Sequence, residues 1–537
     1  MSRKLMLLGD EALALGAVNA GLSGVYAYPG TPSTEITEYI QENAVARERG
    51  VHSHWSTNEK TAMEEALGMS FCGRRAMVCM KHVGMNVCAD PFVNSAMTGA
   101  NGGLLVAAAD DPSMHSSQNE QDSRFYSAFA FIPTLEPSDQ QEAYDMASYG
   151  FELSERYGTP VMVRLVTRLS HSRSVVDCAD VADEERELTY PPADKTRQWV
   201  LMPGNSRIRY KEVLKGWEDL KNASESSPFN SYIPGSDHSL GIVAAGIGFN
   251  YLNENFPEGS CPYPVVKVSQ YPLPEAMLGK LYDECERILV IEDGQPFIEE
   301  QMRSVVGDNS RVCGRLTGDL PRTGELTPDS VRRALGLPEL PHGEKCKVVA
   351  GRPPSLCQGC GHRDVFHALN DVLKEYESAK VFGDIGCYTL GWLSPFNAID
   401  TVVDMGASIT MAKGAADAGQ HPAIAVIGDS TFTHSGMTGL LDAINENTPV
   451  TIIISDNLTT GMTGGQPSQG TGKLEAICIG LGADPAHVRT IDALPKNHAD
   501  MTAMFREEID YRGVSVIVSR RECIQTARRH AASATRK

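Results

Sequence analysis

The sequence lacks any apolar segment of the roughly 20 residues that a membrane-spanning helix needs. The apolar run near the start, Leu5 to Leu8, ends at Gly9-Asp10-Glu11 and is too short for the core of a secretory signal, so we interpret it as a first β-strand. The 13 cysteines are an odd number scattered over 537 residues, which is typical of free thiols in a reducing compartment. We therefore expect a cytoplasmic protein that does not associate with a membrane.

Positive charge is also scarce. Lys and Arg number 48 against 68 Asp and Glu, which gives a formal net charge of −20. Nucleic-acid binding needs clustered basic side chains that neutralise phosphates. The one basic cluster, Arg520 to Lys537, is either a solvated end of the chain or a docking surface for an acidic redox partner. A nucleic-acid-binding role is therefore not expected.

The length allows about three to four domains, each able to bury a core. Short apolar runs bounded by Gly, Pro or polar residues recur along the chain, as buried parallel strands do. They favour an α/β fold with three modules and mostly parallel sheets. The predicted divisions are residues 1–180, a polar linker at 181–239 with one helix near Lys211 to Lys221, residues 240–345 and residues 346–537.

Two polar segments follow neighbouring predicted strands of the last module. Gly428-Asp429-Ser430 follows Ala423 to Ile427, and Asp456-Asn457 follows a strand that ends near Ser455. In a parallel α/β sheet, ligands bind at the carboxyl ends of strands. One carboxylate and one amide oxygen suit Mg²⁺, and glycines let a diphosphate approach the backbone closely. We therefore predict a magnesium and diphosphate site here, rather than two ordinary strand-end turns.

Cysteine spacing provides a second signal. Cys357 and Cys360 form a Cys-x-x-Cys pair on a Gly-containing loop, and Cys387 follows later in the same module. Such thiolates can hold one metal centre between them. The spacing alone leaves zinc and a redox dithiol as alternatives.

Three polar segments of the first module lie where strands end or helices begin. Tyr28 to Glu35 is a strand-to-helix turn in which Thr31-Pro32 suits an N-cap followed by a first helical residue. Lys81 to Asn86 follows a strand, and its lone histidine, His82, has an ordinary structural reading. Asp110 to Arg124 is polar and dense, as surface loops often are.

The Gly-Asp-Ser…Asn pattern resembles the diphosphate and magnesium site of thiamine-diphosphate enzymes. The run from Gly461 to Gln466 (Gly-Met-Thr-Gly-Gly-Gln) narrows the resemblance to the 2-oxoacid:ferredoxin oxidoreductases. The runs Asn58-Glu59-Lys60, Lys81 to Asn86 and Ser116 to Arg124 are similar to the α subunits of the indolepyruvate oxidoreductase family. So is the order of modules, with pyrimidine binding first and diphosphate binding last. The resemblance covers essentially the whole chain.

The resemblance implies a pyrimidine-binding domain at 1–180, a transketolase C-terminal-like domain at 240–345 and a diphosphate-binding domain at 346–537. It implies thiamine diphosphate, Mg²⁺ and a [4Fe–4S] cluster, with coenzyme A as co-substrate. Mg²⁺ would be held by Asp429, Asn457 and the backbone carbonyl of Thr459. The residues expected at the thiamine cofactor are Gly406, Ser408, Gly428, Asp429, Ser430, Asn457, Thr459, Gly461, Met462, Thr463 and Cys387.

The family's cluster ligands match cysteines of the last module. The resemblance assigns this role to Cys357, Cys360 and Cys387, with Cys523 as the fourth because it follows the last predicted strand. Cys478 is the alternative fourth ligand. The remaining cysteines are expected to be buried small apolar residues.

The resemblance also implies catalytic roles in the first module. Glu59 would bind the aminopyrimidine ring, and Glu64 and Glu65 are its rivals. Thr31 would contact the substrate near its carboxylate, and Arg124 would pair with that carboxylate, which a guanidinium binds well. His82 is a lesser candidate for the active-site lining.

The activity implied is oxidative decarboxylation of indolepyruvate or another arylpyruvate to the arylacetyl-CoA, with electrons passing through the cluster to ferredoxin or another acceptor. The family pairs this chain with a small γ-type (β) subunit, and a dimer of α subunits in a heterotetramer is expected. Its members usually carry a ferredoxin-like tail with Cys-x-x-Cys-x-x-Cys runs, whereas no cysteine follows Cys523 here. We therefore expect electrons to leave for another subunit or a soluble carrier.

Two other functions fit the sequence less well. A non-oxidative thiamine-dependent decarboxylase needs no cluster, so the cysteine set disfavours it. A non-catalytic electron-transfer subunit would have no need of Glu59 together with Asp429 and Asn457.

Overall fold

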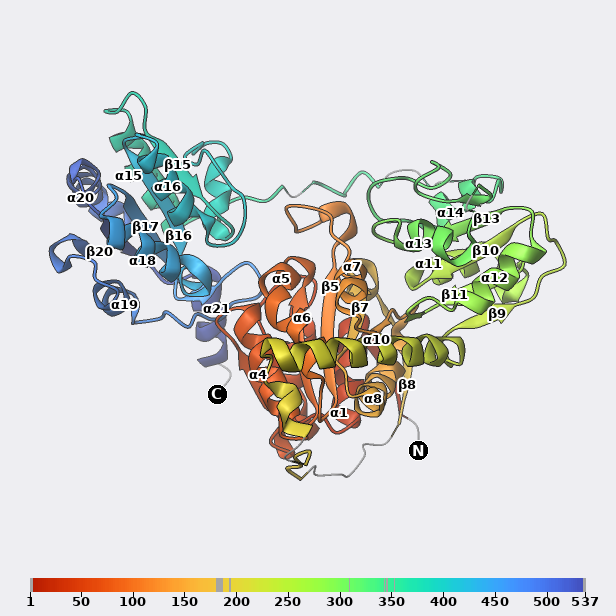
Figure 1. The fold of residues 1–537 in the computed structure, drawn as a ribbon. Helices are drawn as coiled ribbons and strands as arrows, with labels where there is room; N and C mark the ends of the chain where they lie inside the picture. Colours follow the sequence, from red (N-terminus) through yellow and green to blue (C-terminus); the bar gives the residue numbers. More distant parts are fainter. Residues whose placement is uncertain are drawn as a thin grey trace. The chain divides into compact units, whose positions relative to one another are not determined.

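The structure is a computed structural model. It describes residues 3–179, 187–192, 195–308, 310–341, 343, 346–351 and 353–534. The chain divides into two compact units, residues 1–343 and 344–537, drawn in Figure 1. The prediction of an α/β protein with mostly parallel sheets is confirmed. The finer division of the first 345 residues into three parts stays a prediction.

The first unit is built on a seven-stranded sheet. Its order is β12 (Gln270–Tyr271), β6 (Thr134–Leu135), β7 (Val161–Val166), β5 (Leu104–Asp110), β4 (Ala76–Lys81), β2 (Gly24–Ala27) and β3 (His52–Trp55). All neighbouring strands are parallel except β12, which pairs antiparallel with β6. The region predicted as a separate module at 240–345 thus adds an edge strand to the sheet of the first module.

Helices cover both faces of this sheet. They are α1 (Gly9–Asn19), α2 (Thr34–Glu42), α3 (Ala44–Glu48), α4 (Glu59–Phe71), α5 (His82–Val87), α6 (Ala89–Thr98), α7 (Arg124–Ala130), α8 (Gln140–Tyr157) and α9 (Thr167–His171). Successive residues of a strand point to opposite faces. Accordingly Met77 packs in one core with α1 and α8, whereas Val78 packs in the other with α4 and α6.

The first unit also holds a two-stranded ladder and a long helix. β1 (Arg3–Leu8) pairs antiparallel with β8 (Arg173–Cys178), which confirms the predicted first strand. The linker helix, α10 (Pro203–Glu225), extends well beyond the predicted Lys211 to Lys221. None of the helices in the described part of the chain is long and apolar enough to cross a bilayer.

A second sheet of the first unit has five strands. Its order is β14 (Val312–Cys313), β13 (Ile288–Ile291), β10 (Gly241–Ala245), β11 (Val265–Val268) and β9 (Ser231–Ile233), parallel except for β9. Its helices are α11 (Ile247–Asn255), α12 (Glu275–Glu284), α13 (Phe297–Val306) and α14 (Pro328–Ala334).

The second unit has a five-stranded, fully parallel sheet. Its order is β15 (Lys380–Gly383), β16 (Ala423–Gly428), β17 (Thr451–Asp456), β21 (Ser515–Arg520) and β20 (Val488–Asp492). Its helices are α15 (Gly361–Leu373), α16 (Ala407–Asp417), α17 (Asp429–Thr431), α18 (Met437–Glu446), α19 (Leu474–Gly480), α20 (His498–Asp510) and α21 (Ile524–Ala534). A short hairpin, β18 (Thr459–Thr460) with β19 (Gln466–Pro467), follows β17.

The start of α2 differs from the prediction. The helix begins at Thr34 with Ser33 before it, rather than with Thr31 as N-cap. The reason is a closed turn: both the backbone N–H and the hydroxyl of Ser33 donate to the carbonyl of Gly30, at 2.8 and 2.7 Å. Thr31 therefore lies in this turn, ahead of the helix.

Candidate active site

Asp429 and Asn457 lie where two neighbouring strands of the second unit end. β16 and β17 are parallel with Gly428 opposite Ser455, so both polar residues stand at the same edge of the sheet. Asp429 is 2% exposed, and its Oδ2 atom has no hydrogen-bond partner among the described residues. Burial, and next the charge of Asp456, raises the pKa of Asp429 to about 7. A buried carboxylate oxygen without a donor suits a cation, so the donor set fits Mg²⁺.

The segment after Asn457 forms a tight loop. The backbone N–H of Thr459 donates to Oδ1 of Asn457 at 3.2 Å, and the Thr459 hydroxyl donates to the carbonyl of Gln466 at 2.9 Å. The Thr463 hydroxyl donates to Oε1 of Gln466 at 2.6 Å. These bonds give the predicted ligand segment a defined shape.

Gly461 is the point where this loop meets a cysteine. A β-carbon at Gly461 would lie 3.2 Å from Sγ of Cys387 and 3.6 Å from Nδ2 of Asn457. A side chain at position 461 would therefore crowd the sulfur of Cys387. Met462, the next residue, is 60% exposed. Gly461 therefore links the predicted diphosphate segment to the cysteine site, while Met462 points away from the core of its unit.

Asp384 is a site residue that the sequence analysis missed. It is fully buried, and Ser408 donates to its Oδ2 atom from both the backbone N–H, at 3.3 Å, and the hydroxyl, at 2.6 Å. Burial raises the pKa of Asp384 to about 8. Gly406 precedes α16 with a φ of 92°, and a β-carbon there would lie 2.0 Å from Oγ of Ser435. The signal was present, since Asp384 stands in the same Gly-Asp-Ile-Gly-Cys run as Cys387.

Side chains after Gly428 tie these segments together. The contacts are Thr431 Oγ1 to the carbonyl of Ile385 at 3.1 Å, Ser435 Oγ to the carbonyl of Met405 at 2.8 Å, and Ser430 Oγ to Thr460 Oγ1 at 2.9 Å. These bonds join the segment after Gly428 to the chain segments that carry Asp384, Gly406 and Thr459.

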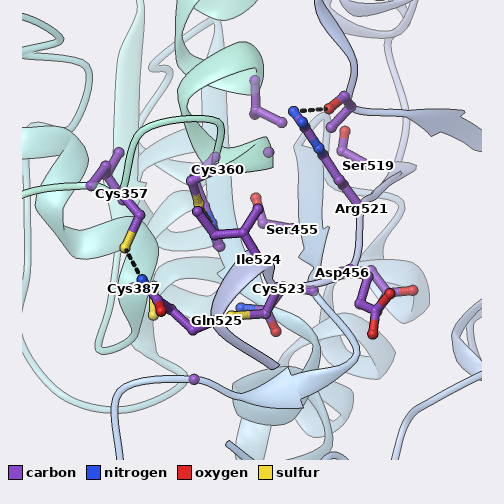
Figure 2. Close-up of a pocket in the computed structure, with 18 of the residues that line it drawn as sticks. Cys357, Cys360, Cys387, Ser455, Asp456, Ser519, Arg521, Cys523, Ile524 and Gln525 are labelled. Atoms are coloured by element: carbon purple, nitrogen blue, oxygen red, sulfur yellow. Dashed lines mark hydrogen bonds between the residues drawn. The ribbon is translucent and has the colours of Figure 1, made fainter. Parts of the chain in front are cut away.

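Four cysteines line one pocket of the second unit, which Figure 2 shows. They are Cys357, Cys360, Cys387 and Cys523, the four predicted cluster ligands. They come from distant parts of the chain: the loop before α15, the segment after β15 and the segment after β21. Asn457 and Gly461 line the same pocket.

The structure distinguishes between Cys523 and Cys478, the two candidates for the fourth cluster ligand. Cys478 lies on α19 with no exposed surface, packed in a core with Leu440 and Ile452, and burial raises its pKa to about 12. It is not among the residues that line the pocket. Cys523 is partly exposed and lines it, so the geometry favours Cys523 as the fourth ligand.

The pocket thiols suit a positively charged centre. Burial, and next the neighbouring thiols of Cys360, Cys523 and Cys357, raises the pKa of Cys387 to about 12. Thiols in this state ionise when a metal replaces their protons. Two nitrogens lie near the sulfurs: His362 Nδ1 is 3.1 Å from Cys360 Sγ, and Gln525 Nε2 is 3.6 Å from Cys357 Sγ. The donor set fits an iron–sulfur cluster.

Glu59 occupies a distinctive place in the first unit. It is the first residue of α4 and is 7% exposed. A β-carbon at Gly84 would lie 2.7 Å from Oε1 of Glu59, so the absence of a side chain at Gly84 leaves room for this carboxylate. The rivals differ: Glu64 is half-exposed and pairs with Lys60, and Glu65 accepts a hydrogen bond from Ser56 at 2.6 Å. The geometry favours Glu59.

The turn that holds Thr31 contacts the loop after β5. The Ser116 hydroxyl donates to the carbonyl of Thr31 at 3.3 Å, and Nζ of Lys81 donates to the carbonyl of Ser116 at 2.7 Å. Burial lowers the pKa of Lys81 to about 8. His82 is fully buried with Nε2 at 3.3 Å from the carbonyl of Asn119, and Nδ1 has no partner among the described residues. Burial lowers the pKa of His82, which favours the neutral imidazole.

The structure corrects the role expected for Arg124. This side chain has no exposed surface, and its guanidinium lies among three carboxylates, at 2.5 Å from Asp122, 2.9 Å from Glu292 and 3.6 Å from Glu136. It also donates to the hydroxyl of Tyr271 at 3.2 Å. Because these acceptors occupy its donors, Arg124 is a buried structural cation rather than a receptor for a substrate carboxylate. Three of these partners, Glu136, Tyr271 and Glu292, lie outside the loop from Asp110 to Arg124, so the local sequence could not predict them.

Two family models match the chain. The model described as "Pyruvate flavodoxin/ferredoxin oxidoreductase, thiamine diP-bdg" matches residues 15–210. The model described as "Thiamine pyrophosphate enzyme, C-terminal TPP binding domain" matches residues 384–519. The first range holds Glu59 and the second holds Asp429 and Asn457, so thiamine-diphosphate-binding domains are present at both ends of the chain.

Curated relatives match nearly the full sequence. "Indolepyruvate oxidoreductase subunit IorA" of Archaeoglobus fulgidus is 37% identical over 550 residues, covering 97% of this chain and 86% of that protein. The protein of the same name from Pyrococcus abyssi is 39% identical over 566 residues, with the same coverage.

A solved structure shows a similar fold. It is a 2-oxoglutarate:ferredoxin oxidoreductase from Magnetococcus marinus with 2-oxoglutarate, coenzyme A and succinyl-CoA bound. The TM-score is 0.51 at 15% identity, over 62% of this chain and 65% of that one. This likeness concerns the fold alone. The relatives matched over 97% of this chain show that it belongs to the indolepyruvate oxidoreductase subunit IorA family of 2-oxoacid oxidoreductases.

Proposed function

We propose that this chain is the catalytic subunit of a 2-oxoacid oxidoreductase that converts indolepyruvate, or another arylpyruvate, to the arylacetyl-CoA. The observation that supports it most is the single pocket that gathers four cysteines beside Asn457 and Gly461. Four thiols next to a thiamine site serve an oxidation, in which electrons must leave the substrate. The aryl substrate rests on the names of the relatives.

The reaction balances as follows. The 2-oxoacid loses carbon dioxide and an electron pair, the acyl group forms a thioester with coenzyme A, and the thiol proton is released. The electron pair would go to ferredoxin or another acceptor, and a cluster held by Cys357, Cys360, Cys387 and Cys523 would supply one-electron transfer between them. Coenzyme A is supported by its presence in the solved 2-oxoglutarate:ferredoxin oxidoreductase. Bound thiamine diphosphate supplies the electron sink for the decarboxylation.

The second unit would bind the diphosphate and its metal. Asp429, Asn457 and the carbonyl of Thr459 would hold Mg²⁺, whose charge stabilises the ionised form of Asp429 against its burial. Asp384 would fix Ser408, and the absence of a β-carbon at Gly406 leaves room for the Ser435 side chain beside it. These groups bind and orient, and they take no part in bond breaking.

The first unit would supply the proton chemistry. Glu59, buried at the start of α4, would hydrogen-bond to the aminopyrimidine ring and exchange a proton with it through its carboxyl oxygen. Thr31 and neutral His82 are proposed to line the substrate side, with Lys81 holding the Ser116 loop against the Thr31 turn. With Arg124 engaged elsewhere, Lys81 is the better-placed cation for a carboxylate.

A [4Fe–4S] cluster fits the cysteine pocket better than one zinc ion. Within the described part of the chain, no three of the pocket sulfurs all lie within 4.8 Å of one another. The one group of three ligand atoms found that close together in this part contains no cysteine. Thiolates on a single Zn²⁺ lie roughly 3.8 Å apart, as Zn–S bonds of about 2.3 Å require. More widely spaced sulfurs suit a cluster of several irons.

The assembly is proposed from the relatives. Their names make each of them one subunit of an oxidoreductase, so we propose a small γ-type partner and a dimer of this chain in a heterotetramer. We keep the proposed domains: pyrimidine-binding at 1–180, a linker at 181–239, transketolase C-terminal-like at 240–345 and diphosphate-binding at 346–537.

The test is a cofactor count on protein purified anaerobically with its small partner, followed by turnover assays. We expect about four irons, matching labile sulfide and one thiamine diphosphate per chain, with arylpyruvate- and coenzyme-A-dependent reduction of a dye. Thiamine diphosphate without iron would point instead to a non-oxidative decarboxylase. Iron without thiamine-dependent turnover would point to an electron-transfer subunit.

A further inference from the structure

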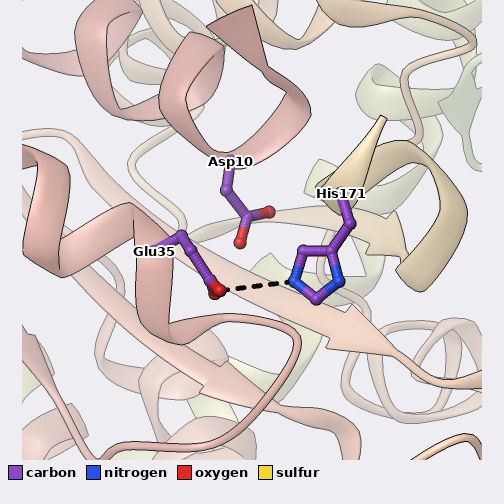
Figure 3. Close-up of side chains that lie close together, drawn as sticks. All are labelled: Asp10, Glu35 and His171. Atoms are coloured by element: carbon purple, nitrogen blue, oxygen red, sulfur yellow. Dashed lines mark ion pairs between the residues drawn. The ribbon is translucent and has the colours of Figure 1, made fainter. Parts of the chain in front are cut away.

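Three ligand-type side chains meet in the first unit, apart from the residues discussed above. They are Asp10 at the start of α1, Glu35 at the start of α2 and His171 at the end of α9, and Figure 3 shows them converging. One donor atom from each lies within 4.8 Å of the other two. Nε2 of His171 is 3.5 Å from Oε1 of Glu35.

Asp10 is unusual because burial raises the pKa of its carboxyl well above the ordinary value, although the nearby Ser170 hydroxyl acts to lower it. It has no exposed surface, and neither of its carboxylate oxygens has a hydrogen-bond partner among the described residues. The Oε2 atom of Glu35 is also buried without a hydrogen-bond partner there. Burying such groups is costly unless something satisfies them. Figure 3 shows the Asp10 carboxylate pointing into the space between Glu35 and His171.

The surrounding charge favours a cation. Besides Glu35, the carboxylates of Glu11 and Asp111 act on this site and add negative potential. Asp10 is closed off, whereas the side chains of Glu35 and His171 are each 35% exposed, so an ion can enter from solvent past them. A buried carboxylate behind two accessible ligands is the arrangement that a bound ion requires.

From these observations we infer that Asp10, Glu35 and His171 form a binding site for one divalent transition-metal ion. Two carboxylates and one imidazole suit borderline ions such as Mn²⁺ or Zn²⁺, since Mg²⁺ and Ca²⁺ prefer oxygen ligands alone. Ligand atoms roughly 2.1 Å from an ion lie about 3.4 Å apart in a tetrahedron, close to the Glu35–His171 separation. Water would complete the shell.

The ion would join three elements at the edge where strands end. Glu35 follows the turn that carries Thr31, and His171 follows β7, whose next residue Thr167 donates to Oδ1 of Asp111 at 2.8 Å. A metal at this point would fasten α2, and with it the Thr31 turn, to α1 and α9. Its role is therefore to hold the shape of this edge.

The test counts bound Mn²⁺ by electron paramagnetic resonance of the free ion, on the full chain with thiamine diphosphate present. Mn²⁺ avoids the thiols, for which Zn²⁺ competes. The variants are Asp10→Asn, which keeps the side-chain shape, and His171→Ala. The control is His498→Ala, because His498 forms a similarly exposed pair with Asp371 at 3.0 Å but, within the described part of the chain, has no third ligand.

We expect Asp10→Asn and His171→Ala each to bind one Mn²⁺ fewer than the wild type, and His498→Ala to bind the same number. Mn²⁺ should also raise the melting temperature of the wild type more than that of Asp10→Asn. Equal Mn²⁺ binding by the wild type and a folded Asp10→Asn variant overturns the inference and leaves a protonated Asp10 beside a Glu35–His171 ion pair. If Asp10→Asn does not fold, equal binding by His171→Ala overturns it.

Discussion

The backbone N–H of Cys523 donates a hydrogen bond of 3.1 Å to the carbonyl oxygen of Asn457. Asn457 follows β17 and Cys523 follows β21, and these two strands are paired in parallel. The predicted magnesium ligand and the predicted fourth cluster ligand thus lie at one end of two adjacent strands. This bond places the proposed cluster beside the proposed cofactor site, as electron transfer between them requires.

The two candidate cysteines make a matched pair of variants. Cys523→Ser removes a thiol from the pocket and should lower the iron content and the visible absorbance of the anaerobic protein. Cys478→Ser changes a buried core residue of α19 and should leave the iron content per folded chain unchanged. Iron and labile sulfide analysis decides this. Iron lost in Cys478→Ser and retained in Cys523→Ser would reverse the assignment.

Glu59→Gln should lower 2-oxoacid-dependent dye reduction by about 100-fold or more, because an amide cannot exchange the proton that the carboxyl holds. Thiamine diphosphate should remain bound. Glu64→Gln, on the same helix but half-exposed and paired with Lys60, is the control and should keep wild-type turnover. Unchanged turnover in Glu59→Gln would remove Glu59 from the mechanism.

Asp429→Asn should weaken magnesium-dependent binding of thiamine diphosphate, since it removes the buried carboxylate whose Oδ2 atom lacks a partner. A loss of about 10-fold or more in affinity is expected for removing a charged metal ligand. Asp442→Asn, exposed on α18, serves as the control. Calorimetric titration with the cofactor at fixed Mg²⁺ measures the change. Equal affinity for both variants would contradict the proposed ligand.

Arg124→Ala should destabilise the first unit by about 3–5 kcal/mol, because it removes the cation beside the buried carboxyl of Glu292 and one of the two arginines that pair with Asp122, the other being Arg164. Arg322→Ala, an exposed side chain, should change the free energy of unfolding by at most about 0.5 kcal/mol. Urea unfolding measures both. A stable Arg124→Ala variant with a raised KM for the 2-oxoacid would restore the substrate-binding role.

The pH dependence of stability follows from Glu292. Burial raises the pKa of this carboxyl to about 7, so the folded chain holds a proton that the unfolded chain releases near pH 4.5. That contribution is fully present below about pH 4.5 and is lost as the pH rises to about 7. Glu292→Gln cannot ionise, so the free energy of unfolding should fall less steeply between pH 5 and 7.

The control for this prediction is Glu300→Gln, an exposed carboxyl on α13. Urea unfolding at several pH values should show the wild-type slope in that variant. An unchanged slope in Glu292→Gln would mean that another carboxyl of the buried network carries the proton.

Much of the second unit could be predicted from local sequence. Asp429 and Asn457 each follow an apolar run that is a strand, and the parallel order of such strands brings their ends together. The Cys-x-x-Cys pair can likewise be recognised from its spacing in the sequence. The relative positions of such residues are fixed by their short separation in the sequence or by the strand that carries them, and do not depend on distant parts of the chain.

By itself, then, the sequence determined the α/β class, and its motifs predicted the proposed magnesium and diphosphate segment and the cysteines Cys357, Cys360 and Cys387, with Cys523 preferred over Cys478 as the fourth. Tertiary structure decided that Cys523 rather than Cys478 lines the pocket, since the packing of α19 against a core buries the latter. It also decided that Arg124 is a structural cation, because Glu136 and Glu292 reach it from other segments. Burial and countercharge come from residues far away in the chain, and no local pattern records them.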